Sequence, residues 1–168
     1  VIYLNSTATP DTTATRWNNT SPTSSVFTIN TSGDINNSTS NHIAYCFADV
    51  KGFSKAFSYT GNGSTDGTFV YTGFSPAWVM IKQSSTSGNG WIMMDNKRNT
   101  YNPNGNYLQA NLSDAEETAG PTVTDFVSNG FKIKTASGRV NTSGATYIGI
   151  AFAENPFVTS GGIPVTAR

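Results

Sequence analysis

Cysteine, histidine and charged side chains are scarce in this sequence, and each scarcity argues against a class of function. The chain has one cysteine, Cys46, which cannot form a disulfide within the chain, and one histidine, His42. Zinc sites need several nitrogen or sulfur ligands at paired spacings, so we expect no metal and no other cofactor. Ten basic residues balance ten acidic ones and form no basic run. Nucleic acid is therefore not an expected partner.

Long apolar runs are also missing, and so are the residues that favour long helices. No run approaches the roughly 18 apolar residues of a membrane-spanning helix, so we expect no membrane insertion. Thr, Ser, Asn and Gly are abundant, whereas Lys, Glu, Leu and Ala are few, which favours strands and turns over long helices. Aromatic residues make up 12% of the chain, which is more than a disordered chain would carry. The composition indicates an all-β protein with a real core.

One segment of the sequence occurs twice, because residues 3–53 match residues 107–157. The match includes Tyr-Leu at the start of each copy, a Phe-x-Ile motif, and a longer apolar motif, Ile43–Ala48 in the first copy and Ile148–Ala153 in the second. A stretch of about 59–106 stands between the copies and occurs once. Repeats of this length are a signature of fold organisation. Because the chain starts inside a repeat, we expect it to be the C-terminal portion of a longer polypeptide.

The apolar motif of the repeat has the pattern of a central strand. In Ile43–Ala48, bulky side chains alternate with small ones, so both faces are apolar and a second layer is expected on the small face. Cys46 lies on that small face and is expected to be buried. Val26–Asn30 alternates apolar and polar residues and is expected to form a half-buried strand.

The rest of the sequence adds strands, turns and one short helical signal. Three further strands are expected at Thr68–Tyr71, Ala77–Lys82 and Trp91–Asp95, the last two forming a hairpin. Residues 61–67 have one carboxylate, too few for calcium, and are expected to form a tight turn. Ser113–Thr118 favours at most one helical turn.

These patterns predict an all-β fold, a jelly-roll-like β-sandwich built from a partly duplicated unit with an extended C-terminal arm. Residues 1–57 form a first half-repeat, residues 58–157 a full β-sandwich repeat, and residues 158–168 the arm. The alternative is that 1–57 and 58–157 form one merged domain.

Catalysis is not expected, although the chain carries several carboxylates. A glycosidase needs two of them at a defined separation. Candidates for such a pair are Asp95, Asp114, Glu116, Glu117 and Asp125. Almost any soluble protein offers as many, so we predict that the chain is not an enzyme and has no catalytic residues.

Glycan binding is the more specific hypothesis, because binding residues concentrate on loops. The polar loop from Asp95 to Tyr107 combines amide, charged and aromatic side chains. The predicted ligand-binding residues are Trp91, Asp95, Arg98, Asn99 and Tyr101. The alternative is a solvated loop beside a packed tryptophan.

Four segments of the sequence resemble a known family of proteins. They are Ile43–Lys55, Ser58–Ser64, Gly73–Lys82 and Ala151–Phe157. Together they are similar to a repeat domain of tail-fibre and other virion structural proteins of tailed bacteriophages, many of them marine. The resemblance covers nearly the whole chain and implies a place on the virion surface. It transfers no catalytic residues.

The resemblance, the composition and the repeat together favour a non-enzymatic structural domain of a phage virion. We expect its partners to be copies of itself and other virion proteins, since virion parts are used in many copies. One alternative is a tail adhesin that binds a host glycan or receptor, and another is a capsid decoration protein.

Overall fold

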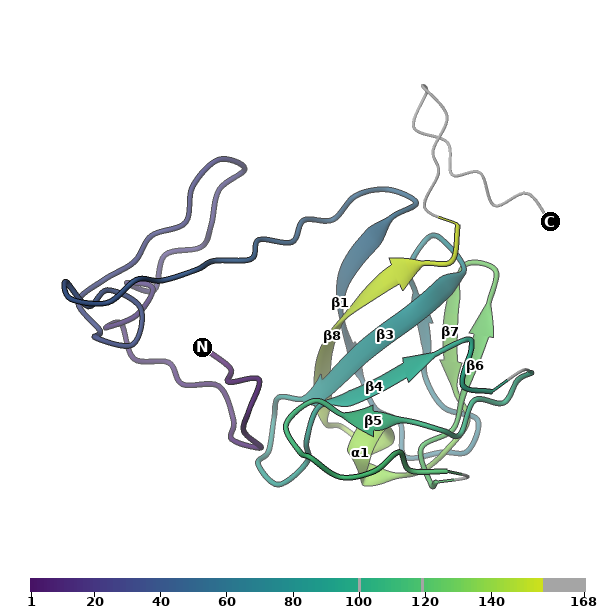
Figure 1. Cartoon of the computed structure of the whole chain (residues 1–168). Helices are drawn as coiled ribbons and strands as arrows, with labels where there is room; N and C mark the ends of the chain where they lie inside the picture. The colour runs from purple at the N-terminus through teal and green to yellow at the C-terminus, as the bar shows by residue number, and fades with distance from the viewer. Residues whose placement is uncertain (100, 119, 156–168) are drawn as a thin grey trace. The chain divides into compact units, whose positions relative to one another are not determined.

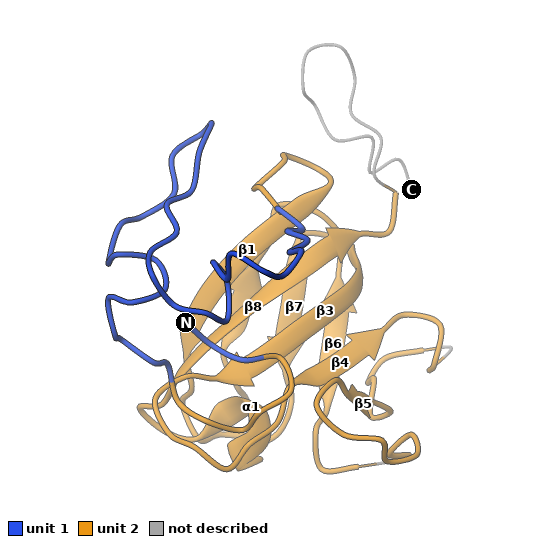
Figure 2. Ribbon diagram, turned by 60° about the vertical axis from the view of Figure 1, so that its left-hand side comes forward, with its two compact units in different colours: residues 1–3, 10–46 blue, residues 4–9, 47–168 orange. Residues whose placement is uncertain are grey.

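The computed structural model describes residues 1–99, 101–118 and 120–155, and it divides into two compact units (Figure 2). The first, called the N-terminal unit here, consists of Val1–Tyr3 and Pro10–Cys46. The second, the packed unit, consists of Leu4–Thr9 and Phe47–Arg168. The predicted C-terminal arm, residues 158–168, lies outside the described residues.

The packed unit is almost entirely β-structure, which confirms the predicted all-β class (Figure 1). One antiparallel sheet has the strand order β1-β8-β3-β4-β5, and the other has the order β2-β7-β6. The strands are β1 (Ser54–Thr60), β2 (Phe69–Tyr71), β3 (Pro76–Gln83), β4 (Ile92–Asp95), β5 (Leu108–Gln109), β6 (Thr124–Val127), β7 (Gly130–Ile133) and β8 (Thr146–Ala153). The one helix of the described residues is the single turn α1 (Gly138–Asn141).

Strand β8 has the two apolar faces that its sequence predicts. It lies between β1 and β3, and Gly149 is paired with Phe57 on one side and Ile81 on the other. The small residues Ala151 and Ala153 belong to the hydrophobic core, so the second layer packs on the small face. A Cβ at Gly149 would lie 2.2 Å from the Met80 carbonyl oxygen, so this position needs glycine.

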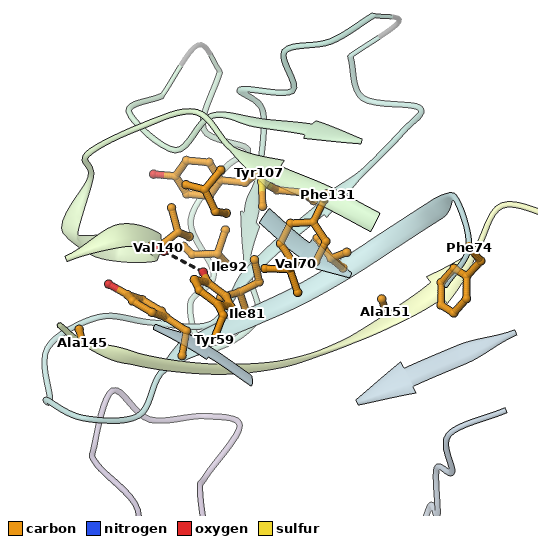
Figure 3. Close-up of a cluster of buried hydrophobic side chains, with 14 of the residues drawn as sticks. Tyr59, Val70, Phe74, Ile81, Ile92, Tyr107, Phe131, Val140, Ala145 and Ala151 are labelled. Atoms are coloured by element: carbon orange, nitrogen blue, oxygen red, sulfur yellow. Dashed lines mark hydrogen bonds between the residues drawn. The ribbon is translucent and has the colours of Figure 1, made fainter. Parts of the chain in front are cut away.

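Both sheets contribute side chains to one hydrophobic cluster (Figure 3). The Tyr59 and Tyr147 rings are stacked with centroids 4.9 Å apart, and Phe131 meets Phe57 edge to face at 5.2 Å. The Tyr59 hydroxyl donates a 2.7 Å hydrogen bond to the Val140 carbonyl, so its polar end is satisfied inside the core. Burial, and secondarily the neighbouring Tyr147, raise the pKa of Tyr59.

A lysine is also buried in the packed unit. Lys82 has no exposed surface, and its ammonium donates a 2.8 Å hydrogen bond to the Asn89 carbonyl. Removing the charge from water lowers the pKa of Lys82. This contact ties the end of the loop between β3 and β4 to β3 itself.

The turn that contains α1 is held by the buried side chain of Asn141. Its Nδ2 lies within hydrogen-bond distance of the Asn62 Oδ1 (3.0 Å), the Ser64 carbonyl (2.8 Å) and the Thr135 carbonyl (2.8 Å). Its Oδ1 accepts from the Asn62 backbone N–H at 2.9 Å. The loop of residues 61–67 is thereby fixed against α1. A Cβ at Gly61 would lie 2.3 Å from the Thr142 carbonyl oxygen, so only glycine fits this close approach.

The N-terminal unit has turns but no strand or helix, although all of residues 1–46 are described. Arg16 organises part of it. Its guanidinium lies 5.2 Å from the Tyr3 ring centroid, 2.6 Å from Asp34, and in contact with Asp11. The backbone N–H and hydroxyl of Thr13, with a smaller contribution from Arg16, lower the pKa of the Asp11 carboxyl.

Three predictions for the first copy are wrong. Val26–Asn30 and Ile43–Ala48 form no strand, and Cys46 is exposed. Strands need hydrogen-bonded neighbours, and in the second copy β7 and β8 find theirs in β1, β2, β3 and β6. Three of those neighbours, β1 to β3, come from residues 54–83, which occur once in this chain. The first copy therefore has the residue pattern of strands, but no neighbouring strand among the described residues pairs with it.

The helical prediction is wrong as well, since Ser113–Thr118 contains no helix. Helix α1 forms elsewhere, directly after its N-cap Ser137. The Ser137 hydroxyl accepts a hydrogen bond from the Arg139 backbone N–H at 3.4 Å. A single turn is too short to be stable by its own propensity, so the buried contacts of Asn141 decide where it forms.

Candidate functional site

A polar depression of about 370 Å³ lies on the packed unit where β3 begins and the loop after β4 passes the end of β6. Amide side chains dominate its lining, and two aromatic rings and one ion pair complete it. The lining residues are Ser75, Pro76, Asn96, Lys97, Asn99, Tyr101, Asn102, Asn104, Phe126 and Glu154.

The loop that forms one wall is shaped by its own Asp and Asn side chains. Asp95 Oδ1 accepts from the backbone N–H groups of Lys97 and Arg98, both at 2.9 Å. Asn99 Oδ1 accepts from the N–H groups of Gly105 (3.0 Å) and Asn106 (2.9 Å). Asx side chains mimic backbone turns in this way, so an Asn-rich sequence folds into a defined loop without strands.

Two contacts anchor the loop to β6. Asn102 donates from Nδ2 to the Phe126 carbonyl at 2.7 Å and accepts at Oδ1 from the Phe126 N–H at 3.0 Å. Asn104 exchanges backbone hydrogen bonds with Thr124 at 2.8 and 2.9 Å. The loop is therefore held like an extra strand against β6, and the depression keeps its shape.

Two groups of ion pairs involve this loop. Arg98 contacts Glu116, and its Nε lies 2.6 Å from Asp95 Oδ2, outside hydrogen-bond geometry. Lys97 Nζ lies 3.8 Å from Glu154 Oε1, and the Ser75 hydroxyl donates to Glu154 Oε2 at 3.3 Å. The Arg98 guanidinium pairs with two carboxylates, whereas the Lys97 side chain is largely exposed at the rim of the depression.

Two lining residues, Asn96 and Asn104, have a side-chain oxygen that is buried and has no hydrogen-bond partner among the described residues. Asn104 is 2% exposed. A buried acceptor without a partner costs about 1–3 kcal/mol, so such groups are rare unless something binds them.

The structure divides the predicted ligand-binding residues into two groups. Asn99 and Tyr101 line the depression, and Tyr101 is 83% exposed. Asp95 and Arg98 shape the loop and pair with each other, and Trp91 is buried at the start of β4. These last three do not line the depression.

Sequence reasoning missed most of the remaining lining residues. Asn96 and Asn104 belong to the same Asn-rich loop, and their sequence offered a weak signal. Phe126, Glu154 and Ser75 come from distant parts of the chain, and only the pairing of the strands brings them to this place.

The comparison with known families matches residues 1–156 to DUF7483, a domain of unknown function. The chain belongs to this family. The match includes both the N-terminal unit and the described part of the packed unit, so the half-repeat is part of what defines DUF7483. No curated protein and no solved structure matches the chain.

The described residues of this DUF7483 chain hold neither a candidate metal cluster nor a candidate membrane-spanning helix. Nowhere in them do three or more His, Cys, Asp or Glu side chains gather as metal ligands would. None of their helical segments has the length and apolar character needed to cross a membrane.

Proposed function

We propose that this DUF7483 chain is a non-enzymatic structural domain on the surface of a bacteriophage virion, as part of a tail fibre or another exposed component. It assembles with copies of itself and with other virion proteins. The similarity of its motifs to phage virion proteins supports the location. The uncovered apolar side chains of its first copy support the assembly.

Those uncovered side chains are the observation that carries the proposal. Ile43 is 82% exposed, Tyr45 81% and Phe47 67%, whereas their equivalents in β8 of the second copy, Ile148, Ile150 and Phe152, are half-buried. Runs of large apolar side chains on a soluble protein mark interaction surfaces. A virion component is present in many copies and lies next to other proteins, so it can bury such a surface against its neighbours.

The proposed fold of the packed unit is a jelly-roll-like β-sandwich. Its two sheets share one hydrophobic cluster, as the two layers of a sandwich do. The neighbours β1, β8 and β3 are distant in sequence, which fits the crossing connections of such folds.

The virion location predicts that the chain purifies with particles. Phage particles from a host carrying the encoding phage are separated on a density gradient, and peptides of the chain are measured by mass spectrometry. We expect them in the particle band, with antibody labelling on the particle surface. Recovery of the chain only from the soluble lysate would contradict the proposal.

A second function, binding of a host glycan, is favoured by the amide-rich lining of the depression beside an exposed aromatic ring. Sugar hydroxyls form hydrogen bonds with amide side chains, and Tyr101 offers an exposed ring at the rim. Ligand sites commonly combine apolar surface with a few well-placed polar groups. This candidate adds an adhesin role to the structural one.

The Tyr101→Ala variant tests glycan binding. We expect it to weaken binding on an array of host surface polysaccharides by roughly tenfold or more, because the exposed ring no longer covers the sugar. Tyr71→Ala is the matched control, since Tyr71 is also exposed, at 65%, and does not line the depression. Absence of binding by the parent chain, or equal loss in both variants, would count against this function.

A further inference from the structure

The turn region of the first copy has the same hydrogen bonds as that of the second, although its surroundings differ. Five bonds of residues 30–42 recur at the equivalent positions of 135–147. Three of them join backbone groups: Ile35 N–H to Ser32 O (3.2 Å) recurs as Val140 N–H to Ser137 O (3.2 Å), Asn36 N–H to Ser32 O (2.9 Å) recurs as Asn141 N–H to Ser137 O (2.8 Å), and Ser40 N–H to Asn37 O (3.3 Å) recurs as Ala145 N–H to Thr142 O (3.1 Å). The other two bonds use side chains. Asn36 Nδ2 to Asn30 O (2.8 Å) recurs as Asn141 Nδ2 to Thr135 O (2.8 Å), and Asn37 N–H to His42 Nε2 (3.2 Å) recurs as Thr142 N–H to the Tyr147 hydroxyl (2.8 Å).

A second turn recurs as well. The Thr23 N–H donates to the Val26 carbonyl at 2.9 Å, and Val127 pairs with Gly130 at the equivalent place in the β6–β7 hairpin. Both turns of the half-repeat therefore form from their own sequence.

In the second copy the turn is covered by residues 59–64. Gly63 N–H donates to the Asn141 carbonyl at 2.9 Å, and Asn62 exchanges hydrogen bonds with the Asn141 side chain. Gly61 N–H donates to the Ala145 carbonyl at 2.9 Å. Strands β1 and β3 then pair along both edges of β8.

In the first copy the same positions are uncovered. Asn36 is exposed where Asn141 is fully buried, and His42 is exposed where Tyr147 is fully buried. Phe27 is 43% exposed, whereas its equivalent Phe131 is completely buried. The half-repeat thus presents a preformed turn and two strand-patterned segments that are largely exposed, although Phe27 touches Trp17 and Phe47 touches Phe152 edge to face.

We propose that residues 1–48 are an acceptor for a polypeptide segment built like residues 54–104, and that they form β-strands at 26–30 and 42–48 when it binds. The occupant brings a Tyr-x-Gly-Asn-Gly loop to Asn36 and two strands to the edges of 43–48, as residues 59–63, β1 and β3 do in the packed unit. This deepens the assembly role proposed above by naming the partner. Its test uses no virions, so failure of the virion location and failure of this contact are separate results.

The proposed partner segment must differ from residues 54–104 at two points where its backbone comes close to the half-repeat. The first copy has Val26 and Ala44 where the second has Gly130 and Gly149. A Cβ at Gly130 would lie 2.1 Å from the Val70 carbonyl oxygen, and one at Gly149 would lie 2.2 Å from that of Met80. The natural partner therefore has its backbone farther away at these two points.

The test is a fused chain in which a second copy of residues 54–104 stands immediately before Val1. Two residues then separate it from Tyr3, as two separate Asn104 from Tyr107. Val26→Gly and Ala44→Gly are included in the fused chain so that this segment fits. We expect amide hydrogen exchange of residues 26–30 and 42–48 to slow by about 100-fold or more relative to the unfused chain with the same two changes.

Asn36→Ala supplies the matched control. In the fused chain it removes the partner of the added Asn62 and should speed exchange at residues 42–48 by about tenfold or more, whereas in the unfused chain it should change exchange there little. Unchanged exchange at 26–30 and 42–48 in the fused chain would overturn the proposal, as would an added segment that stays unprotected. Protection of these residues in the unmodified chain that rises with concentration would assign the surface to a second copy, and would also overturn it.

Discussion

Replacing Phe131 with alanine should lower the free energy of unfolding of the packed unit by about 3–5 kcal/mol, the range for large-to-small changes at buried aromatic positions. Phe131 is completely buried and meets the rings of Phe57 at 5.2 Å and Tyr59 at 6.5 Å. The change leaves a cavity between side chains of both sheets. Urea unfolding followed by tryptophan fluorescence measures the effect.

Phe27→Ala is the control, because Phe27 occupies the equivalent position of the first copy. It is 43% exposed and touches Trp17 edge to face at 6.0 Å. The same deletion there should cost at most about 1 kcal/mol, since little apolar surface returns to water. Equal losses for the two variants would show that the copies are packed alike in solution, contrary to the structure.

Replacing Asn141 with alanine should lower the free energy of unfolding by about 2–4 kcal/mol. The side chain bonds to Asn62, Ser64 and Thr135, and each buried group that loses its partner costs about 1–3 kcal/mol. The loop of residues 61–67 should lose its protection against amide exchange before the sheets unfold, because Asn141 holds it in place.

Asn36→Ala is the matched comparison for this variant. Asn36 makes the same bond within its turn, to the Asn30 carbonyl at 2.8 Å, but it is exposed. Its loss should cost no more than about 0.5 kcal/mol, as surface substitutions usually do. A small effect of Asn141→Ala, similar to that of Asn36→Ala, would mean that the buried amide does not hold the loop.

Strands with a clear pattern and a nearby partner were predictable from the sequence. Thr68–Tyr71 corresponds to β2, and the hairpin of Ala77–Lys82 with Trp91–Asp95 corresponds to the antiparallel pair β3 and β4. Strands β1, β5 and β6 were missed. β1 mixes polar and apolar residues, Ser-Lys-Ala-Phe-Ser-Tyr-Thr, and becomes a strand because β8 offers it a ladder of seven paired residues.

The candidate site was predictable only as a loop. Its Asp and Asn residues pointed to a turn-rich polar segment, and Asn99 and Tyr101 do line the depression. The roles of Asp95 and Arg98 depend on Glu116 and on backbone groups whose positions the loop itself creates. The opposite wall, with Phe126 and Glu154, exists because β6 and β8 end beside the loop.

The sequence by itself determined the β-class, the repeat, and the turns of both copies, because turns depend on side chains that bond to the backbone a few residues away. Only the tertiary structure decided which copy becomes strand. Ile148–Ala153 and Ile43–Ala48 have nearly the same pattern, yet one belongs to an interior strand of a five-stranded sheet and the other is exposed. A strand is stabilised by neighbours distant in sequence, and this chain contains one set of them for two copies.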